Sequence, residues 1–188
     1  MINKNTSNSK GFSFVELMVV IALIGLLSAI GLPSLLRSLP EKRLKNAARS
    51  LYADLQKAKL LAVKENKNVT VTFDTAKKQY SFIDDNGNTV ATTISLADSG
   101  SVQYGCNATT LNNWRQSPAA VGIPDTTIPP SGVTGVTGDE KIIFTNLGVA
   151  NTADIYLQDD NVQEVCYAVT VSMLGSVKIL RYNGSSWE

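Results

Sequence analysis

The hydrophobic pattern of this chain opens with a long apolar segment. Between Leu17 and Leu36, 20 consecutive residues carry no charge, and only Ser28 and Ser34 are polar. At 1.5 Å per residue, a helix of this length covers about 30 Å, the thickness of the hydrocarbon core of a bilayer. The pattern therefore predicts a membrane-spanning helix over residues 12–36.

The helical pattern continues beyond this segment in amphipathic form, over residues 37–66. Small and apolar residues recur there every three or four positions, which places them on one face: Leu44, Ala47, Ala48, Leu51, Leu55, Ala58, Leu61 and Ala62. The basic residues fall mostly elsewhere, either as a solvated face or as a patch that meets acidic neighbours. We expect Pro33, and less strongly Pro40, to kink or loosen the helix.

After Asn66 the period changes from helical to alternating, which is typical of strands. The predicted strands cover residues 68–74, 79–84, 89–96, 141–148, 153–158 and 166–182, and the last of these is a hairpin that turns near 174–176. Residues 105–139 are rich in Gly, Pro, Ser, Thr and Asn and predict a long irregular loop. The predicted fold is α+β, with one long helix packed on an antiparallel β domain over 67–188.

Charge is distributed unevenly along the 188 residues, although the net charge is only +1. Residues 1–11 contain Lys4 and Lys10 and no acid, whereas residues 41–67 contain eight basic and three acidic groups. Residues 68–188 contain six basic and twelve acidic groups, a net charge of −6. The β region is therefore acidic, which argues against a generally basic nucleic-acid surface.

The chain has two cysteines, Cys106 and Cys166, and no histidine. The sequence contains no Ser/His/Asp or Cys/His set, no P-loop and no glycine-rich dinucleotide turn, so we expect neither an enzyme nor a cofactor. The cysteines lack zinc-site spacing, and the acid clusters at 84–85 and 159–161 lack the spacing of a calcium loop, so no metal site is predicted. If this region is exported, a disulfide between the cysteines is the favoured interpretation, and two separate buried thiols are the alternative.

Glu16 is an ionisable residue at the start of the apolar segment, where a charge in lipid costs a few kcal/mol, roughly 2.5–3.5 at the bilayer centre. The basic leader before it favours a cytoplasmic N-terminus, with the rest of the chain outside. A secretory signal peptide has its apolar stretch before the cleavage site, with small residues at the cut. Here the order differs, because a short polar leader comes first and the apolar stretch follows it intact.

The stretch "KGFSFVELMVVIALIGLLSAIGLP" (10–33) resembles the class III signal of type IV pilins and type II secretion pseudopilins. This resemblance implies that a prepilin peptidase removes the leader 1–11 by cleaving between Gly11 and Phe12, and that Phe12 is then N-methylated. One mild departure is that Ser13 and Phe14 replace the more usual Thr and Leu or Ile.

The same resemblance implies a role for Glu16 in assembly. Glu16 falls at the fifth mature position, where the family has its acid, and Gly25 and Pro33 match the family's helix-weakening positions. In the family, the glutamate pairs with the amino terminus of a neighbouring subunit, and such a pair sets the register because either charge alone is costly in lipid. The alternative is a plain membrane anchor whose Glu16 reaches the headgroups.

Weaker matches after the signal resemble the GspH/FimT branch of minor pilins: "NAARSLYADLQKAKLLAVKENKNVTVTF", "IIFTNLG" and "VTVSMLGSVKI". Two functions remain open. The favoured one is a structural subunit of a type IV pilus or type II secretion pseudopilus, inserted in the bacterial inner membrane and assembled near the filament tip. Its partners would be other pilin subunits, the prepilin peptidase, the inner-membrane assembly platform and the lipid bilayer. The alternative is a FimT-like subunit that binds DNA during natural transformation through Lys178 and Arg181, although nucleic acid is not the expected partner.

Overall fold

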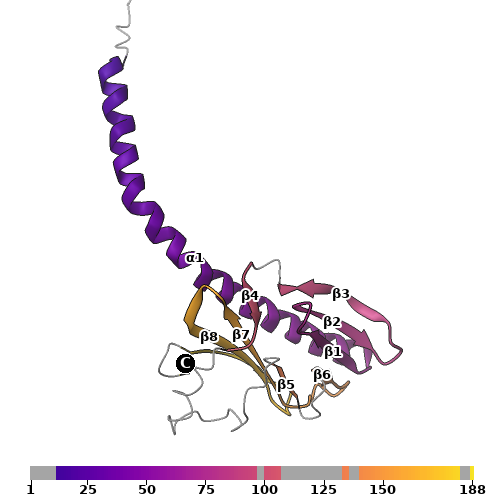
Figure 1. Ribbon diagram of the computed structural model, residues 1–188. Helices are drawn as coiled ribbons and strands as arrows, with labels where there is room; N and C mark the ends of the chain where they lie inside the picture. The colour runs from indigo at the N-terminus through magenta and orange to yellow at the C-terminus, as the bar shows by residue number, and fades with distance from the viewer. Residues whose placement is uncertain (1–11, 97–99, 107–132, 136–139, 183–186) are drawn as a thin grey trace, which may run out of the picture. The chain divides into compact units, whose positions relative to one another are not determined.

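The computed structural model describes residues 12–96, 100–106, 133–135, 140–182 and 187–188. These residues form one helix, α1 (Phe14–Glu65), and nine strands, most of which are labelled in Figure 1. The chain divides into two compact units, with the boundary between Leu39 and Pro40. Because α1 extends across this boundary, its first part belongs to one unit and its second part to the other.

In the first unit, the helix exposes apolar side chains on every side. The window Phe14–Gly31 is long and apolar enough to cross a membrane, and none of it is buried within the protein. Leu27 and Ile30, for example, are 69% and 74% exposed. The helix continues through Pro33 without ending there, and the loosening expected at Gly25 and Pro33 stays a prediction.

The second unit contains two antiparallel sheets. The first sheet has the order β3-β2-β1-β6, and its strands are β3 (Thr89–Ser95), β2 (Gln79–Asp84), β1 (Val69–Asp74) and β6 (Lys141–Phe144). β1 alternates buried and half-buried residues along its length, as expected for a strand with one face against the core. Tight turns join β1 to β2 and β2 to β3, whereas β6 pairs with β1 after a long excursion.

The second sheet has the order β4-β7-β8-β9, and β5 also pairs with β7. Its strands are β4 (Val102–Tyr104), β5 (Val133–Gly135), β7 (Ala153–Asp159), β8 (Val162–Val171) and β9 (Val177–Tyr182). β4 pairs with the C-terminal end of β7 and β5 with its N-terminal end. The two short strands therefore share one edge of β7.

The core of the second unit lies between α1 and the two sheets. The helix contributes a face made of leucines and alanines that are at least 97% buried: Leu44, Ala47, Ala48, Leu51, Leu55, Ala58 and Ala62. Both sheets pack against this face. The first sheet contributes Phe73 and Phe144 to the core, and the second contributes Ile155 and Val169. Each fully buried Leu contributes about 1.5–3 kcal/mol relative to exposure, while the small alanines let the helix approach the strands closely.

β7 is buried on both faces, unlike the strands of the first sheet. Ile155 and Leu157 face the main core, and Tyr156 faces the opposite side of the sheet, because side chains alternate along a strand. On that side the ring of Trp187 lies 6.1 Å from Tyr156 and 5.4 Å from Tyr182, measured between ring centroids. Trp187 thus completes a small aromatic cluster on the outer face.

The predicted fold class, a long helix on antiparallel strands, is confirmed. The strands β4 and β5 were not predicted, because three residues are too few to show an alternating pattern; β5 lies inside the segment expected to be irregular. β8 begins at Val162, before the expected start at 166, because polar residues at 163 and 164 obscure the pattern. The rest of the expected loop, residues 107–132 and 136–139, lies outside the described residues.

Candidate functional site

The N-terminal end of α1 contains the residues that the sequence singles out for processing and assembly. Phe12 precedes the helix and is 88% exposed. The first backbone hydrogen bond of the turn runs from Leu17 N–H to the Ser13 carbonyl, at 3.2 Å. Glu16 lies in the first turn, where the helix dipole stabilises a carboxylate. Gly11 and the leader lie outside the described residues.

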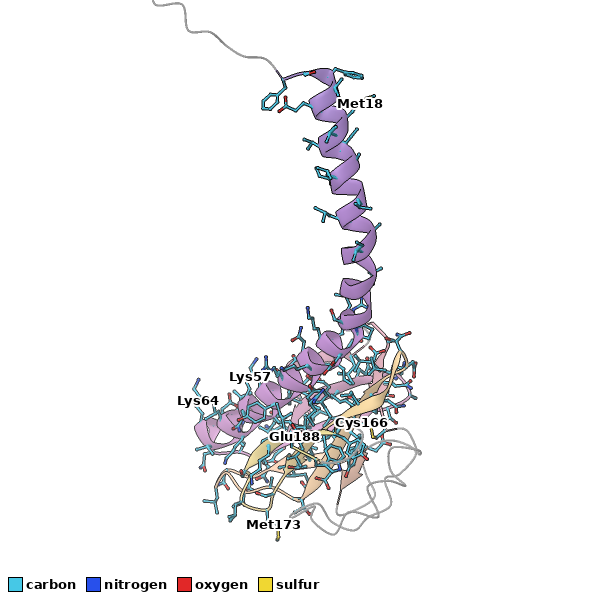
Figure 2. The ribbon with its side chains drawn as sticks, turned by 90° about the vertical axis from the view of Figure 1, so that its left-hand side faces the viewer. Met18, Lys57, Lys64, Cys166, Met173 and Glu188 are labelled. Atoms are coloured by element: carbon cyan, nitrogen blue, oxygen red, sulfur yellow. A yellow bond between two sulfur atoms is a disulfide. The ribbon has the colours of Figure 1, made fainter. Side chains whose placement is uncertain are left out.

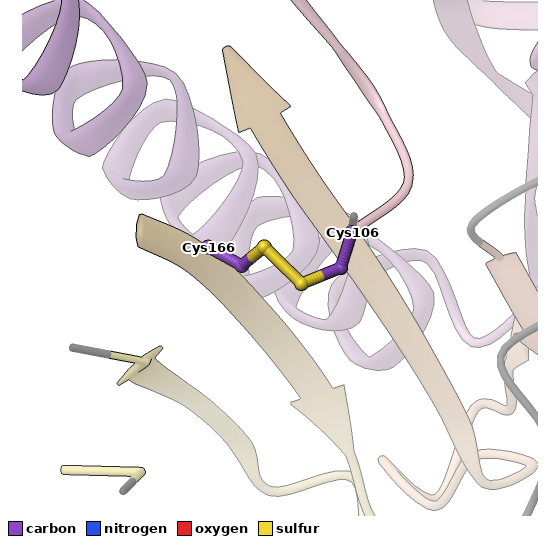
Figure 3. Close-up of a disulfide and its surroundings, with 2 residues drawn as sticks. All are labelled: Cys106 and Cys166. Carbon is purple, nitrogen blue, oxygen red and sulfur yellow. A yellow bond between two sulfur atoms is a disulfide. The ribbon is translucent and has the colours of Figure 1, made fainter. Parts of the chain in front are cut away.

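Cys106 and Cys166 form a disulfide, as predicted, with their Cα atoms 5.8 Å apart. Figure 3 shows this bridge joining Cys166 on β8 to Cys106, which follows β4. The cysteines are 60 residues apart in sequence, so a loop-closure model gives a stabilisation of about 4 kcal/mol. The bridge therefore fastens the chain just after β4 to β8, two strands of the second sheet that do not pair directly with each other.

Lys178 and Arg181, the residues named for DNA contact, do not form one cationic patch. Both lie on β9, but an odd spacing along a strand places them on opposite faces. Arg181 Nη2 donates a hydrogen bond to Glu41 Oε1 at 2.7 Å and forms an ion pair with it. Lys178 is exposed, so a DNA backbone would meet one available cation on this strand.

The acidic clusters serve as turn-forming groups. Asp84 Oδ1 accepts hydrogen bonds from the backbone N–H groups of Asn86 and Asn88, at 3.0 and 2.8 Å. Asp159 Oδ1 accepts bonds from Asn161 and from the Ser101 hydroxyl, the latter at 2.7 Å. Within the described ranges, no group of three or more His, Cys, Asp or Glu residues could hold a metal ion.

Two of the buried groups with strongly shifted pKa values are Asp154 and Tyr80, and neither lies in a catalytic arrangement. Burial raises the pKa of Asp154, on β7, to about 6. Burial, together with a hydrogen bond to Asp54, also raises the pKa of Tyr80 well above its usual range; the Tyr80 hydroxyl donates to Asp54 Oδ2 at 2.6 Å. This second contact ties the helix to β2, so it is structural.

Two glycine turns pack against the end of α1, and the sequence patterns did not reveal their contact. Gly148 and Gly175 both have positive φ, 77° and 66°, a conformation that favours glycine. A Cβ built on Gly175 would lie 2.0 Å from the Gly148 carbonyl oxygen, so a side chain cannot fit there. Lys59 Nζ donates to the Gly175 carbonyl at 2.9 Å. The segments "IIFTNLG" and "VTVSMLGSVKI" thus meet at these glycines.

These features define a class of protein with one long N-terminal helix. The first part of the helix is apolar and has an acid in its first turn, and the second part packs on antiparallel sheets. The chain belongs to the family described as type II transport protein GspH, whose model matches residues 47–175. A second model, the prokaryotic N-terminal methylation motif, matches residues 6–32. Proteins of this family are structural subunits of the pilin and pseudopilin type rather than enzymes.

Among solved structures, the chain is similar to the minor pseudopilin EpsH from the type 2 secretion system of Vibrio cholerae. The two share 15% identity with a TM-score of 0.49, over 77% of this chain and 99% of that one. It is also similar to the type IV minor pilin FimU of Pseudomonas aeruginosa, with 14% identity and a TM-score of 0.49, over 74% of this chain and 89% of that one. No curated protein sequence matches this chain.

Proposed function

We propose that this chain is a structural minor subunit of a type IV pilus or a type II secretion pseudopilus. A prepilin peptidase cleaves between Gly11 and Phe12, and Phe12 is N-methylated. The apolar part of α1 anchors the subunit in the bacterial inner membrane with its β domain outside. The assembly platform then inserts the subunit into the filament, near the tip.

One observation carries this proposal: α1 is exposed and apolar along Phe14–Gly31, although the second unit has a complete core of its own. Exposed apolar surface of this extent is stable only in lipid or against similar helices. A subunit that moves from a membrane into a helical filament meets both environments in turn. Family membership and the matched methylation motif support the same proposal.

In this proposal Glu16 pairs with the new amino terminus of a neighbouring subunit. Cleavage converts the Phe12 nitrogen into a cation, four residues from the Glu16 carboxylate. Away from water, either charge alone costs several kcal/mol, whereas an intersubunit pair compensates both. The pair would therefore be satisfied only when subunits have the correct axial offset.

The experiment replaces Glu16 with Gln in the full chain expressed in its host. We expect normal leader removal and membrane insertion but about tenfold or lower recovery in isolated filaments, because the neighbour's amine is left buried and unpaired. Ser28→Val, which removes a neutral polar group from the same helix, serves as the matched control and should assemble normally. Incorporation of Glu16→Gln at the wild-type level would contradict the role of Glu16.

The residues named for DNA binding do not support it as a second function. Its two candidate residues, Lys178 and Arg181, point to opposite faces of β9, and Arg181 is engaged by Glu41. Phosphate contacts dominate the affinity of nonspecific DNA binding and require several cations on one surface.

A further inference from the structure

The second part of α1 carries a row of cations on its exposed side, here called the basic stripe. Its members are Lys42, Lys45, Arg49, Lys57 and Lys64, and all five are exposed. At about 100° per residue they lie within an arc of ~120°, and they extend over about 33 Å of helix. Figure 2 shows Lys57 and Lys64 projecting from α1 on the side away from the strands.

No acid in this part of the helix neutralises the basic stripe. Glu41 is ion-paired with Arg181, and Asp54 accepts the hydrogen bond from Tyr80. Glu65 lies outside the arc by the same rotation per residue. Within the residues that the structure describes, none of the five cations forms an ion pair.

The other cations of this helix segment contact the protein itself, which makes the basic stripe distinct. A Cβ built on Gly100 would lie 3.3 Å from Arg43 Nη1, so the Arg43 side chain covers this loop. Lys59 donates to the Gly175 carbonyl. Both side chains flank the exposed arc, and both are used to hold loops against the helix.

The basic stripe does not serve the stability of the isolated helix. Lys42 and Lys45 are three positions apart, and Lys45 and Arg49 are four apart. Like charges at these spacings repel and destabilise a helix by about 0.2–0.5 kcal/mol per pair. A partner that supplies negative charge would convert this repulsion into attraction.

The surface between the cations favours a protein partner over a polyanion. Ala53, Leu60 and Val63 are exposed on the same arc, and Leu60 is 67% exposed. Aliphatic side chains complement a protein surface, whereas a phosphate backbone offers them no apolar contact. The β region of this chain has a net charge of −6, so a subunit of this kind presents acidic surface.

We propose that the basic stripe of α1 docks an acidic face of a neighbouring filament subunit. This inference rests on the proposed function and adds to it the surface used and the chemistry of the partner. The cations steer and orient the partner, and Ala53, Leu60 and Val63 supply apolar contact between them. The contact is separate from Glu16, which lies in the first unit.

The test places a photo-crosslinking amino acid at Ala53, in the middle of the basic stripe, in the full chain in its host membrane. We expect a crosslinked product with a pilin-type subunit, joined through a peptide rich in Asp and Glu. The double variant Lys45→Glu/Arg49→Glu should lower its yield at least about tenfold, because attraction is replaced by repulsion. The matched control Lys141→Glu/Lys178→Glu makes the same charge change at exposed strand positions and should leave the yield unchanged.

The outcomes separate this inference from the proposed function. Normal leader cleavage and membrane insertion of the Lys45→Glu/Arg49→Glu variant, with loss of the crosslink, supports docking through the basic stripe. If the leader is not removed from the unsubstituted chain, this result would instead contradict the proposed function. A crosslink to DNA or lipid, the absence of any crosslink, or a yield that survives the double reversal would overturn the docking proposal. Reversing acids in the crosslinked peptide of the partner should restore the yield to Lys45→Glu/Arg49→Glu.

Discussion

The two parts of α1 have the same backbone and opposite surroundings. Along Phe14–Gly31 apolar side chains are exposed on all sides. Beyond Pro40 most of them lie on one face and are buried there by two sheets, and Leu60 and Val63 are exposed exceptions. A helix that is apolar all round needs a nonaqueous environment, while an amphipathic one is satisfied by its own domain. The second part thus buries most of its apolar surface within the subunit, whereas the first part leaves its apolar surface for lipid or other helices to cover.

A leucine-to-alanine substitution made in each part of α1 should give the strongest contrast in the free energy of unfolding. Leu51→Ala removes a side chain that is fully buried against the sheets, and should lower the free energy of unfolding by about 2–5 kcal/mol. Leu26→Ala changes a side chain that is 63% exposed, and should leave this free energy within about 0.5 kcal/mol. Urea unfolding of the full chain in detergent, followed by near-UV circular dichroism, measures both. Equal losses would remove the distinction between the two parts.

A pair of glycines provides a second, smaller contrast. Gly175→Ala introduces a Cβ 2.0 Å from the Gly148 carbonyl oxygen at a residue with φ of 66°, so we expect a loss of about 1–3 kcal/mol from backbone strain. Gly31→Ala meets no atom within 4 Å and improves helix propensity, so no loss is expected. The same unfolding measurement applies, and a stable Gly175→Ala variant would show that the two turns can move apart freely.

How far the sequence predicted these features depends on the length of the pattern that encodes each one. The helix was predictable because its apolar face repeats over many turns, as from Leu44 to Ala62, and β2 because residues 79–84 alternate. The three-residue strand β4 carries no such repeat. Arg181 is a long-range case, since its partner Glu41 is 140 positions away and no local pattern encodes that contact. The disulfide could be predicted because the chain has only two cysteines and because this region was assumed to be exported.

A third and smaller change in stability depends on pH and involves Asp154 on the buried outer face of β7. No part of the window Phe14–Gly31 in α1 is buried in this way. The pKa of Asp154 is raised by burial from 3.8 to about 6, so the folded state holds this proton more tightly than the unfolded state. Stability from this group is therefore present below about pH 4 and is lost as the pH rises to about 6, by about 1–2 kcal/mol.

Asp154→Asn removes that titration while keeping the side-chain shape. The difference in unfolding free energy between wild type and Asp154→Asn should shift in favour of the variant between pH 4 and pH 7. Unfolding curves measured at several pH values across this range give the difference directly. A difference that stays constant, or that shifts in favour of wild type, would contradict the assignment to Asp154.

The intact mass of the chain isolated from its host filaments shows directly whether the leader has been removed and Phe12 methylated. We expect the mass of a chain that begins at Phe12 and carries one added methyl group, and we expect a Gly11→Glu variant to keep its leader and stay out of filaments. A wild-type chain that retains residues 1–11 within functioning filaments would contradict the proposed function, because no neighbour could then offer Glu16 a free Phe12 amine.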